Sequence, residues 1–415
     1  MWSLGYIFPT LTDDHQARAH DTRIKVRAST SSFAKPKDDF ARHLLNKFIT
    51  LSLIPLTLLL VSCGGSGSST DYIENSDTGV SGANNSNGSC SQTNWTSGAL
   101  SIEHNGIERK FRVHIPLNYK SDTPAPLVLG FHGWSGNENE FLDNQTVRSQ
   151  LDEYNYIMIT PLGLGSAEPD SSYASWSFRG STTGVDGDEI NQLVANDSEK
   201  ICDTDSTPDY TYQSCADIAE NTCSWTQCLD DDVSFVSLLA TQAQENLCVD
   251  ADRIFATGGS NGGMFVWELG QNESTANIFR ALAPIIGLPH RGYLDEPKKP
   301  NGLPAILVTG MRDTTVPPGD WDDKSFTTTS NGEAFYYTGA SAITEKWAIA
   351  LDCDVSIPPK IIDLDVASTL ECRGWGNCRD TNSYPSILDC RGAEMGHTYN
   401  LDNSWPLIMD FFNDR

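Results

Sequence analysis

The sequence predicts a doubly wound α/β domain built around a mostly parallel sheet. Short apolar runs alternate along the chain with stretches of helical periodicity, and turn residues bound each run. Such runs are typical of strands that helices cover on both faces. Their alternation with helical segments predicts parallel strands joined by crossover helices. The expected strands are residues 126–131, 156–161, 253–258, 281–286 and 304–310.

A hairpin and two helices complete the expected elements. Polarity alternates through LSIEHNGIERKFRVHIP on both sides of Asn105-Gly106, a dipeptide that favours a two-residue hairpin turn. The clearest helix is expected over 231–247, where apolar side chains share a face behind an acidic first turn. The terminal stretch SWPLIMDFF predicts a second helix.

The first 98 residues are expected to lie outside this domain. Residues 45–63 have the layout of a complete signal peptide, so we expect residues 1–44 not to be translated. The tetrad Leu60-Val61-Ser62-Cys63 resembles the lipobox of bacterial lipoproteins, in which the cysteine is lipidated, and a plain secretory signal is the alternative. Residues 64–98 are rich in Gly, Ser and Asn, which predicts a flexible linker.

The folded domain is expected to span residues 99–415, with an insertion at 166–230. The insertion breaks the alternation of strand and helix because it is polar and rich in Asp, Ser and Thr. It carries cysteines but too few apolar residues for a core of its own. We therefore expect a surface insertion stapled by disulfides.

The cysteines predict disulfides and an oxidising compartment. There are eleven, and if Cys63 carries lipid, the other ten suffice for five bridges, which a cytosolic chain of this size seldom keeps. We expect bridges within 202–228 and among 353, 372, 378 and 390. A bridge from Cys248 would brace the strand that follows it. No metal site is expected, because the spacing offers no CxxC pair and no nearby pair of histidines.

The charge excludes one class of partner. The formal net charge is −27, and no basic patch appears along the chain. Because a polyanion would be repelled, nucleic-acid binding is not expected. The sequence predicts no oligomeric state, and a membrane is expected as a partner only through a lipid anchor at Cys63.

The motif Gly258-Gly259-Ser260-Asn261-Gly262 predicts a nucleophile at a strand-to-helix turn. It follows the apolar run RIFATG and opens the helical run MFVWEL. A G-x-S-x-G serine occupies a strained turn whose neighbours must be small, and its hydroxyl projects above the sheet. A phosphate-binding loop is the main rival, but its Lys-Ser/Thr pair is missing.

A serine nucleophile needs a base and an orienting carboxylate. In α/β hydrolases the order along the chain is serine, acid, histidine. Only His290 and His397 follow the serine, and His290 leaves no room for the acid, so His397 is the expected base. Asp313 follows the apolar run PAILVTG and is the expected acid. Three aspartates in the next polar loop are alternatives, at positions 320, 322 and 323.

Two backbone amides are expected to form the oxyanion hole. The Asn261 amide lies at the start of the helix after the serine. The second is the Trp134 amide in VLGFHGWSG, where Gly133 lets the loop turn toward the nucleophile. His132 is expected to be a structural brace of this loop.

Together these segments resemble the esterase family that includes feruloyl esterases and polyhydroxybutyrate depolymerases. The resemblance covers residues 100–415 and is strongest in CVDADRIFATGGSNGGMF, PLVLGFHGWSGNENEF, DDVSF and RDTTVP. It implies an α/β-hydrolase fold, catalytic roles for Ser260, Asp313 and His397, and no metal or organic cofactor. The chain departs from the family at Thr309, where a histidine often stands, at Gly259, a cysteine in the tannase-like branch, and in GHTYN, which lacks the usual Trp-Pro.

The substrate is the least determined part of the prediction. Four aromatic residues could line a cleft for a hydroxycinnamoyl ester on a polysaccharide, or could merely pack the insertion: Trp134, Tyr173, Trp176 and Trp225. A polyester such as polyhydroxybutyrate is the alternative substrate, although no separate polymer-binding module is evident. A non-catalytic, glycan-binding surface lipoprotein is the alternative of another class.

Overall fold

A ten-stranded sheet forms the centre of the chain that the structure describes. The structure is a computed structural model, and it describes residues 90, 94–165, 173–181, 201–203, 206–207, 214, 225–329, 332–364, 369–379 and 382–415. The predictions for residues 1–44 and 45–63, including Cys63, lie outside these residues. So do those for nearly all of the linker at 64–98 and much of the insertion at 166–230.

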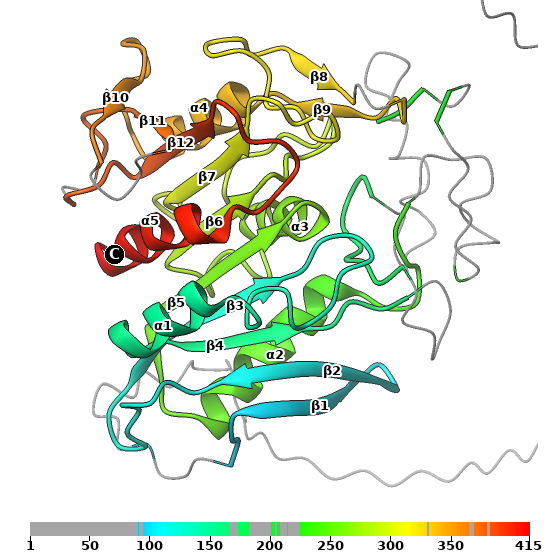
Figure 1. The fold of residues 1–415 in the computed structure, drawn as a ribbon, viewed down its shortest axis with the longest axis vertical. Helices are drawn as coiled ribbons and strands as arrows, with labels where there is room; N and C mark the ends of the chain where they lie inside the picture. The colour runs from blue at the N-terminus through cyan, green and yellow to red at the C-terminus, as the bar shows by residue number, and fades with distance from the viewer. Residues whose placement is uncertain are drawn as a thin grey trace, which may run out of the picture. The chain divides into compact units, whose positions relative to one another are not determined.

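The strands follow the order β1-β2-β4-β3-β5-β6-β7-β12-β11-β10, from the lower to the upper end of Figure 1. The six from β4 to β12 are parallel, and antiparallel strands extend the sheet at both ends. A separate two-stranded sheet pairs β8 with β9. The bounds are β1 (Gly98–His104), β2 (Ile107–His114), β3 (Ala125–Phe131), β4 (Ile157–Pro161), β5 (Val249–Gly259), β6 (Ala281–Ile285), β7 (Ala305–Gly310), β8 (Phe326–Thr328), β9 (Tyr336–Thr338), β10 (Lys360–Ile362), β11 (Glu371–Gly374) and β12 (Ile387–Gly392).

Helices cover both faces of the sheet, which explains the apolar character of its central strands. Side chains of α2 (Asp232–Asn246), α3 (Asn261–Gln271) and α4 (Ala340–Ala350) pack on one face, and those of α1 (Gln145–Tyr154) and α5 (Leu401–Asn413) on the other. All residues of β3, β4, β6 and β7 are buried. The predicted α/β class, the five parallel strands, the hairpin and both helices are confirmed.

Most of the described residues at the flanks of the predicted insertion are buried. Arg109 on β2 reaches both Asp230 and Asp232 over 2.6 Å, and all three side chains are fully buried. Ser177 donates its amide to Asp232 over 2.7 Å, and Gln227 donates to the same carboxylate over 2.9 Å. Polar residues can be buried here because hydrogen bonds and an ion pair satisfy them.

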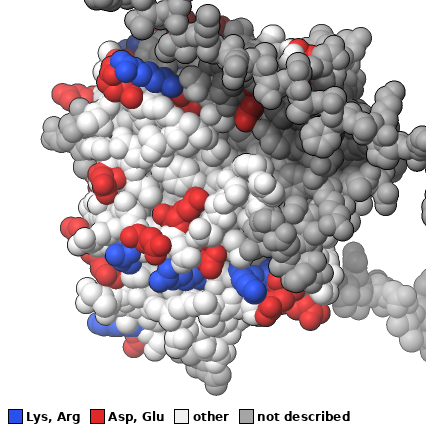
Figure 2. Space-filling model, turned by 45° about the vertical axis from the view of Figure 1, so that its right-hand side comes forward, with Lys and Arg blue, Asp and Glu red and all other residues white. Residues whose placement is uncertain are grey.

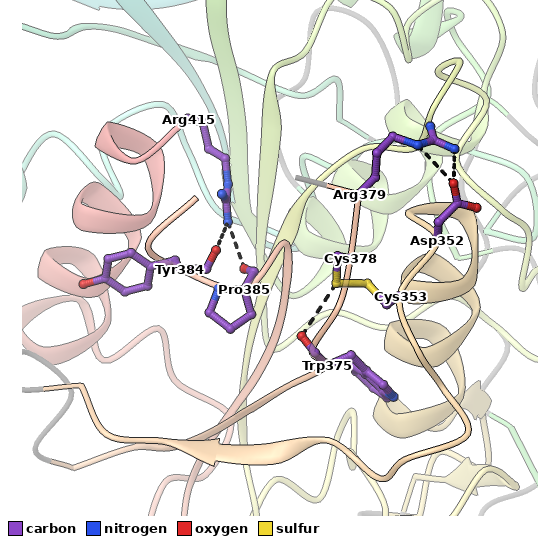
Figure 3. Close-up of a disulfide and its surroundings, with 8 residues drawn as sticks. All are labelled: Asp352, Cys353, Trp375, Cys378, Arg379, Tyr384, Pro385 and Arg415. Carbon is purple, nitrogen blue, oxygen red and sulfur yellow. Dashed lines mark hydrogen bonds and ion pairs between the residues drawn. A yellow bond between two sulfur atoms is a disulfide. The ribbon is translucent and has the colours of Figure 1, made fainter. Parts of the chain in front are cut away.

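Disulfides link β11 to β12 and several loops to each other. Cys90 pairs with Cys248, which lies between α2 and β5, and Cys372 pairs with Cys390 across β11 and β12. Figure 3 shows a third bridge, between Cys353 and Cys378. Cys202 and Cys228 are disulfide-bonded as well. The predicted pairing among 353, 372, 378 and 390 is confirmed, and so is a bridge from Cys248.

The bridge in Figure 3 ties the end of α4 to the segment that follows β11. Asp352, next to Cys353, forms an ion pair with Arg379, next to Cys378. The Arg379 amide donates to the carbonyl of Leu351 over 2.9 Å. The upper end of the sheet is therefore held by a covalent and a polar link at the same place.

Charged side chains are interspersed on the face that Figure 2 shows, where several basic groups lie beside acidic ones. Arg112 and Asp143 form one exposed ion pair, and Arg312 and Glu394 form another. Among the described residues, no helix combines the length and apolarity that crossing a bilayer requires.

Candidate active site

Ser260 occupies a strained turn between β5 and α3. Its φ of 54° and ψ of −118° lie outside the helical and strand regions, and its amide donates to the carbonyl of Ile285 over 2.9 Å. A Cβ atom on Gly262 would stand 2.2 Å from the carbonyl oxygen of Phe131, and one on Gly258 would stand 2.4 Å from that of Gly262. The motif therefore needs glycines because β3, β5 and α3 approach each other backbone to backbone.

His397 and Asp313 complete a hydrogen-bonded chain with the serine. His397 lies in the loop between β12 and α5, and its Nε2 is 2.9 Å from Ser260 Oγ. Its Nδ1 is 2.7 Å from Asp313 Oδ2. An ionised carboxylate can only accept hydrogen bonds. The Nδ1 atom of His397 therefore carries the proton, and its Nε2 atom accepts from the serine hydroxyl. The structure brings together the three residues that the sequence predicts as a triad.

Asp313 is held in place by the turn that it opens. Its Oδ1 accepts the amides of Thr315 and Val316 over 2.8 and 2.9 Å, and its side chain is fully buried. Two of the alternative aspartates bond elsewhere: Asp322 lies 3.7 Å from Arg373, and Asp323 accepts the amide of Ser325. The buried position and the two amides leave Oδ2 free to orient the imidazole.

The predicted oxyanion loop lies against the nucleophile. A Cβ atom on Gly133 would be 3.4 Å from Ser260 Cβ, which places the residue before Trp134 next to the serine. Asn261 is the first residue of α3, so its amide lies at the positive end of the helix. Gly133, the residue before Trp134, and Asn261, the residue after Ser260, thus both lie next to the serine.

His132 braces this loop, as the sequence predicts. It is buried, its Nε2 accepts the Gly163 amide over 2.9 Å, and its Nδ1 lies 2.7 Å from the carbonyl of Gly133. Burial lowers the pKa of His132 to about 4, so the imidazole is neutral at physiological pH. A neutral ring with its proton on Nδ1 satisfies both neighbours.

Two cavities meet at Ser260 and His397. A cavity of about 230 Å³ is largely apolar, and aromatic or aliphatic residues line most of its wall: Trp134, Trp225, Met264, Val316, Phe335 and Tyr337. A larger cavity of about 520 Å³ is lined mainly by polar groups: Glu140, Asn144, Thr398, Tyr399 and Asn400. Trp134 contributes to both. The serine therefore stands between an apolar and a polar space.

The four aromatic residues that the sequence predicts at the substrate occupy different positions in the structure. Trp134 and Trp225 line the apolar cavity, and Tyr173 stacks on Trp134 with ring centroids 5.3 Å apart. The prediction for Trp176 is wrong. Its indole is fully buried, stacks on Phe265 in the core and donates to the carbonyl of His132 over 2.9 Å. Packing of the oxyanion loop, not substrate contact, explains this tryptophan.

Phe335 and Tyr337 form a wall of the apolar cavity that sequence reasoning missed, and His290 packs against both rings. His290 is fully buried, accepts the indole N–H of Trp225 over 2.9 Å and stacks on Tyr337. Burial lowers the pKa of His290 to about 4, so this ring is neutral too. The only signal in the sequence is the aromatic run AFYYT, which alone does not place these side chains near Ser260.

Comparisons with known proteins give weak structural likenesses only. No family model and no curated protein matches the chain. Among solved structures, it is similar to the acetyl xylan esterase from Aspergillus awamori, with 14% identity and a TM-score of 0.47 over 77% of this chain and 100% of that one. It is also similar to a putative dienelactone hydrolase from Klebsiella pneumoniae, with 14% identity and a TM-score of 0.40 over 77% and 99%. A third structure, esterase PE8, is 12% identical, with a TM-score of 0.38 over 74% and 99%.

These likenesses are too weak to bear on the activity of this chain, and the sheet itself identifies the fold. The strands before and after Ser260 are parallel, and an antiparallel hairpin lies at one end of the sheet. The serine stands at a strained strand-to-helix turn, and the acid and histidine follow it in that order along the chain. The chain has the α/β-hydrolase fold.

Proposed function

We propose that this protein is an exported serine esterase that cleaves carboxylic esters between an apolar acyl group and a polar, sugar-like alcohol. The observation that carries the proposal is the hydrogen-bonded chain from Ser260 through His397 to Asp313, open to one apolar and one polar cavity. A hydroxycinnamoyl group would occupy the aromatic space, and the sugar to which it is linked would occupy the polar space.

The proposed reaction has two steps. Ser260 Oγ attacks the ester carbonyl while His397 Nε2 takes the hydroxyl proton, and the amides of Trp134 and Asn261 bind the oxyanion. The C–O bond to the alcohol then breaks, the alcohol leaves with the proton from His397, and an acyl-serine remains. Water attacks this ester with His397 as the base, and the acid and free Ser260 are released. Asp313 keeps Nδ1 protonated throughout.

Hydrolysis of a polyester such as polyhydroxybutyrate is the second candidate. It would place a repeating, weakly polar chain on both sides of the serine. The contrast between the apolar cavity and the cavity with Glu140 and Asn144 favours the hydroxycinnamoyl ester. A glycan-binding protein without activity is the candidate of another class, and the intact triad geometry argues against it.

One experiment separates the three candidates. Purified protein and its Ser260→Ala variant are incubated in parallel with a feruloylated oligosaccharide, with polyhydroxybutyrate and with p-nitrophenyl acetate, and the released acid is measured. Release of ferulate that Ser260→Ala abolishes supports the proposal. Faster release of hydroxybutyrate supports the polyester. No release from any substrate between neutral and alkaline pH contradicts an esterase and favours the binding protein.

Export rests on the leader at 45–63 and on the cysteines. The eight described cysteines are all disulfide-bonded, which an oxidising compartment permits. In the proposed mature protein, Cys63 carries lipid and the linker at 64–98 holds the esterase away from the membrane. Incorporation of labelled palmitate that Cys63→Ser abolishes would support the anchor. Unlabelled protein in the medium would instead support the plain secretory signal.

A further inference from the structure

Glu140 and Tyr399 connect the segments that carry the proposed reaction. Tyr399 lies two residues after His397, and its hydroxyl donates to Glu140 Oε2 over 2.7 Å. The same carboxylate oxygen accepts the Gly133 amide over 3.2 Å, immediately before the tryptophan of the oxyanion loop. The tyrosine hydroxyl is also 3.3 Å from the carbonyl oxygen of Gly259, immediately before the nucleophile.

The tyrosine ring packs against the same two backbone segments. A Cβ atom on Gly259 would stand 2.0 Å from Tyr399 Cε1, and one on Gly133 would stand 2.8 Å from its hydroxyl oxygen. Phe141 covers the ring from another side, with centroids 5.6 Å apart. Burial and the neighbouring Glu140 carboxylate raise the pKa of Tyr399 well above its usual value. The hydroxyl therefore keeps its proton and can donate at neutral pH.

We infer that Glu140 and Tyr399 are positioning residues, which hold the oxyanion loop at a set distance from the nucleophile turn. The inference rests on the proposed acyl transfer. Neither residue touches the reacting atoms in the proposed reaction, because the carboxylate acts through Gly133 and the hydroxyl through Glu140 and Gly259.

The geometry of an oxyanion hole explains why such a link affects the rate. A backbone amide stabilises the oxyanion only at hydrogen-bonding distance from it. A displacement of about 1 Å can lower a rate about 100-fold. Without the link, the loop would be joined to the nucleophile turn mainly through Trp176, which donates to the carbonyl of His132 and bonds to Asn261. Substrate affinity depends less on this distance, so the effect is expected in kcat.

The test compares four variants with one control, using p-nitrophenyl acetate. Tyr399→Phe removes the hydroxyl and keeps the ring, and Glu140→Ala removes the acceptor. Glu140→Gln keeps a carbonyl oxygen that can accept both donors. The fourth variant combines Tyr399→Phe with Glu140→Ala. The control is Tyr156→Phe, because the Tyr156 hydroxyl is also bonded, to Asn413 over 3.0 Å at the end of α5.

The expected results separate positioning from other roles. Tyr399→Phe and Glu140→Ala each lower kcat about 10- to 100-fold with KM within about threefold, and the double variant is no slower than either single one. Tyr156→Phe keeps kcat within about threefold of the unmodified protein, and Glu140→Gln loses less of kcat than Glu140→Ala does. A kcat within twofold in Tyr399→Phe overturns the inference, as does a change in KM alone, which would indicate substrate contact. A loss of kcat that is fully explained by a smaller fraction of folded protein would also overturn the inference.

A phosphonate probe separates failure of this inference from failure of the proposed function. A fluorophosphonate forms a tetrahedral adduct on a reactive serine, and its rate of attachment to Ser260 is measured by mass spectrometry. If the unmodified protein is not labelled, the proposed esterase fails. If it is labelled and Tyr399→Phe is labelled at the same rate, only the positioning role fails. Slower labelling of Tyr399→Phe at unchanged melting temperature supports the role.

Discussion

Asn261 and Trp176 are joined by two hydrogen bonds that link the nucleophile helix to the chain's insertion. Asn261 Oδ1 accepts the Trp176 amide over 2.8 Å, and Asn261 Nδ2 donates to the Trp176 carbonyl over 3.1 Å. Both residues are fully buried. The residue after the proposed nucleophile therefore serves the site with its backbone amide and the fold with its side chain.

The first prediction follows from this division of roles. Asn261→Ala leaves a buried N–H and a buried carbonyl of Trp176 without partners, each of which costs about 1–3 kcal/mol. We expect the free energy of unfolding to fall by about 2–5 kcal/mol, measured by denaturant titration. Asn94→Ala, which removes an exposed side-chain hydrogen bond to Asn246, serves as the control. It should change the free energy of unfolding by less than about 0.5 kcal/mol. Equal losses in the two variants would contradict the prediction.

The second prediction concerns the acid of the triad. In Asp313→Asn, the amide oxygen can still accept from Thr315 and Val316, so the turn should persist. The amide nitrogen would then face His397 Nδ1 and favour the wrong imidazole tautomer. We expect kcat to fall about 10⁴-fold with an unchanged fold by circular dichroism. Asp320→Asn, in the neighbouring loop, is the control. Activity of Asp313→Asn within tenfold of the unmodified protein would exclude Asp313 as the acid.

The central strands and the triad could be predicted from the sequence because both depend on local signals. Buried parallel strands are apolar throughout, and the serine turn carries its glycines with it. Strand β12 gave no such signal, because Asp389 and Arg391 make it look polar. Within the fold these two buried side chains form an ion pair over 2.6 Å, and Arg391 also donates to Ser341 over 2.9 Å. Because the two charged residues form an ion pair only in the folded protein, the sequence alone does not indicate that this strand is buried.

The remainder of the site depends on contacts between residues far apart in sequence. Glu140 and Tyr399 are separated by 259 residues, and each resembles an ordinary loop residue in isolation. The sequence predicts Trp176 at the substrate because it is an aromatic residue in a polar insertion. Its position in the core depends on Phe265 and on the buried flanks of the insertion. The aromatic composition of a segment does not reveal which rings reach a cavity.

The third prediction ranks two disulfides. Cys90 and Cys248 are 158 residues apart, and Cys353 and Cys378 are 25 apart. In the chain-entropy account, a longer closed loop restricts the unfolded chain more, which gives about 5 kcal/mol for the first bridge and about 3.5 kcal/mol for the second. Replacement of both cysteines of a bridge by serine should therefore lower the melting temperature more for Cys90 and Cys248. The reverse order would show that native contacts around the bridges, not loop length, set their contribution.

The fourth prediction concerns pH and the two buried histidines. The pKa of His132 and that of His290 are both lowered to about 4 by burial, whereas a histidine in the unfolded chain has a pKa of about 6.5. Below pH 6.5 the unfolded chain binds protons at these two positions that the folded protein does not bind. The free energy of unfolding is therefore not reduced by these residues above pH 6.5, and it falls as the pH drops toward 4. Each histidine steepens this fall by up to about 1.4 kcal/mol per pH unit.

His290→Gln removes one of these two proton-binding sites while leaving a carbonyl oxygen that can accept from the Trp225 indole. The free energy of unfolding of this variant should be lower at pH 7, because a packed ring is lost. Between pH 6 and pH 5, however, it should fall less steeply than that of the unmodified protein, by about 1 kcal/mol per pH unit. Carboxylates that titrate in this range contribute equally to both proteins and cancel in the difference. Denaturant titrations at half-unit intervals measure both slopes, and parallel slopes would mean that His290 takes up its proton without unfolding.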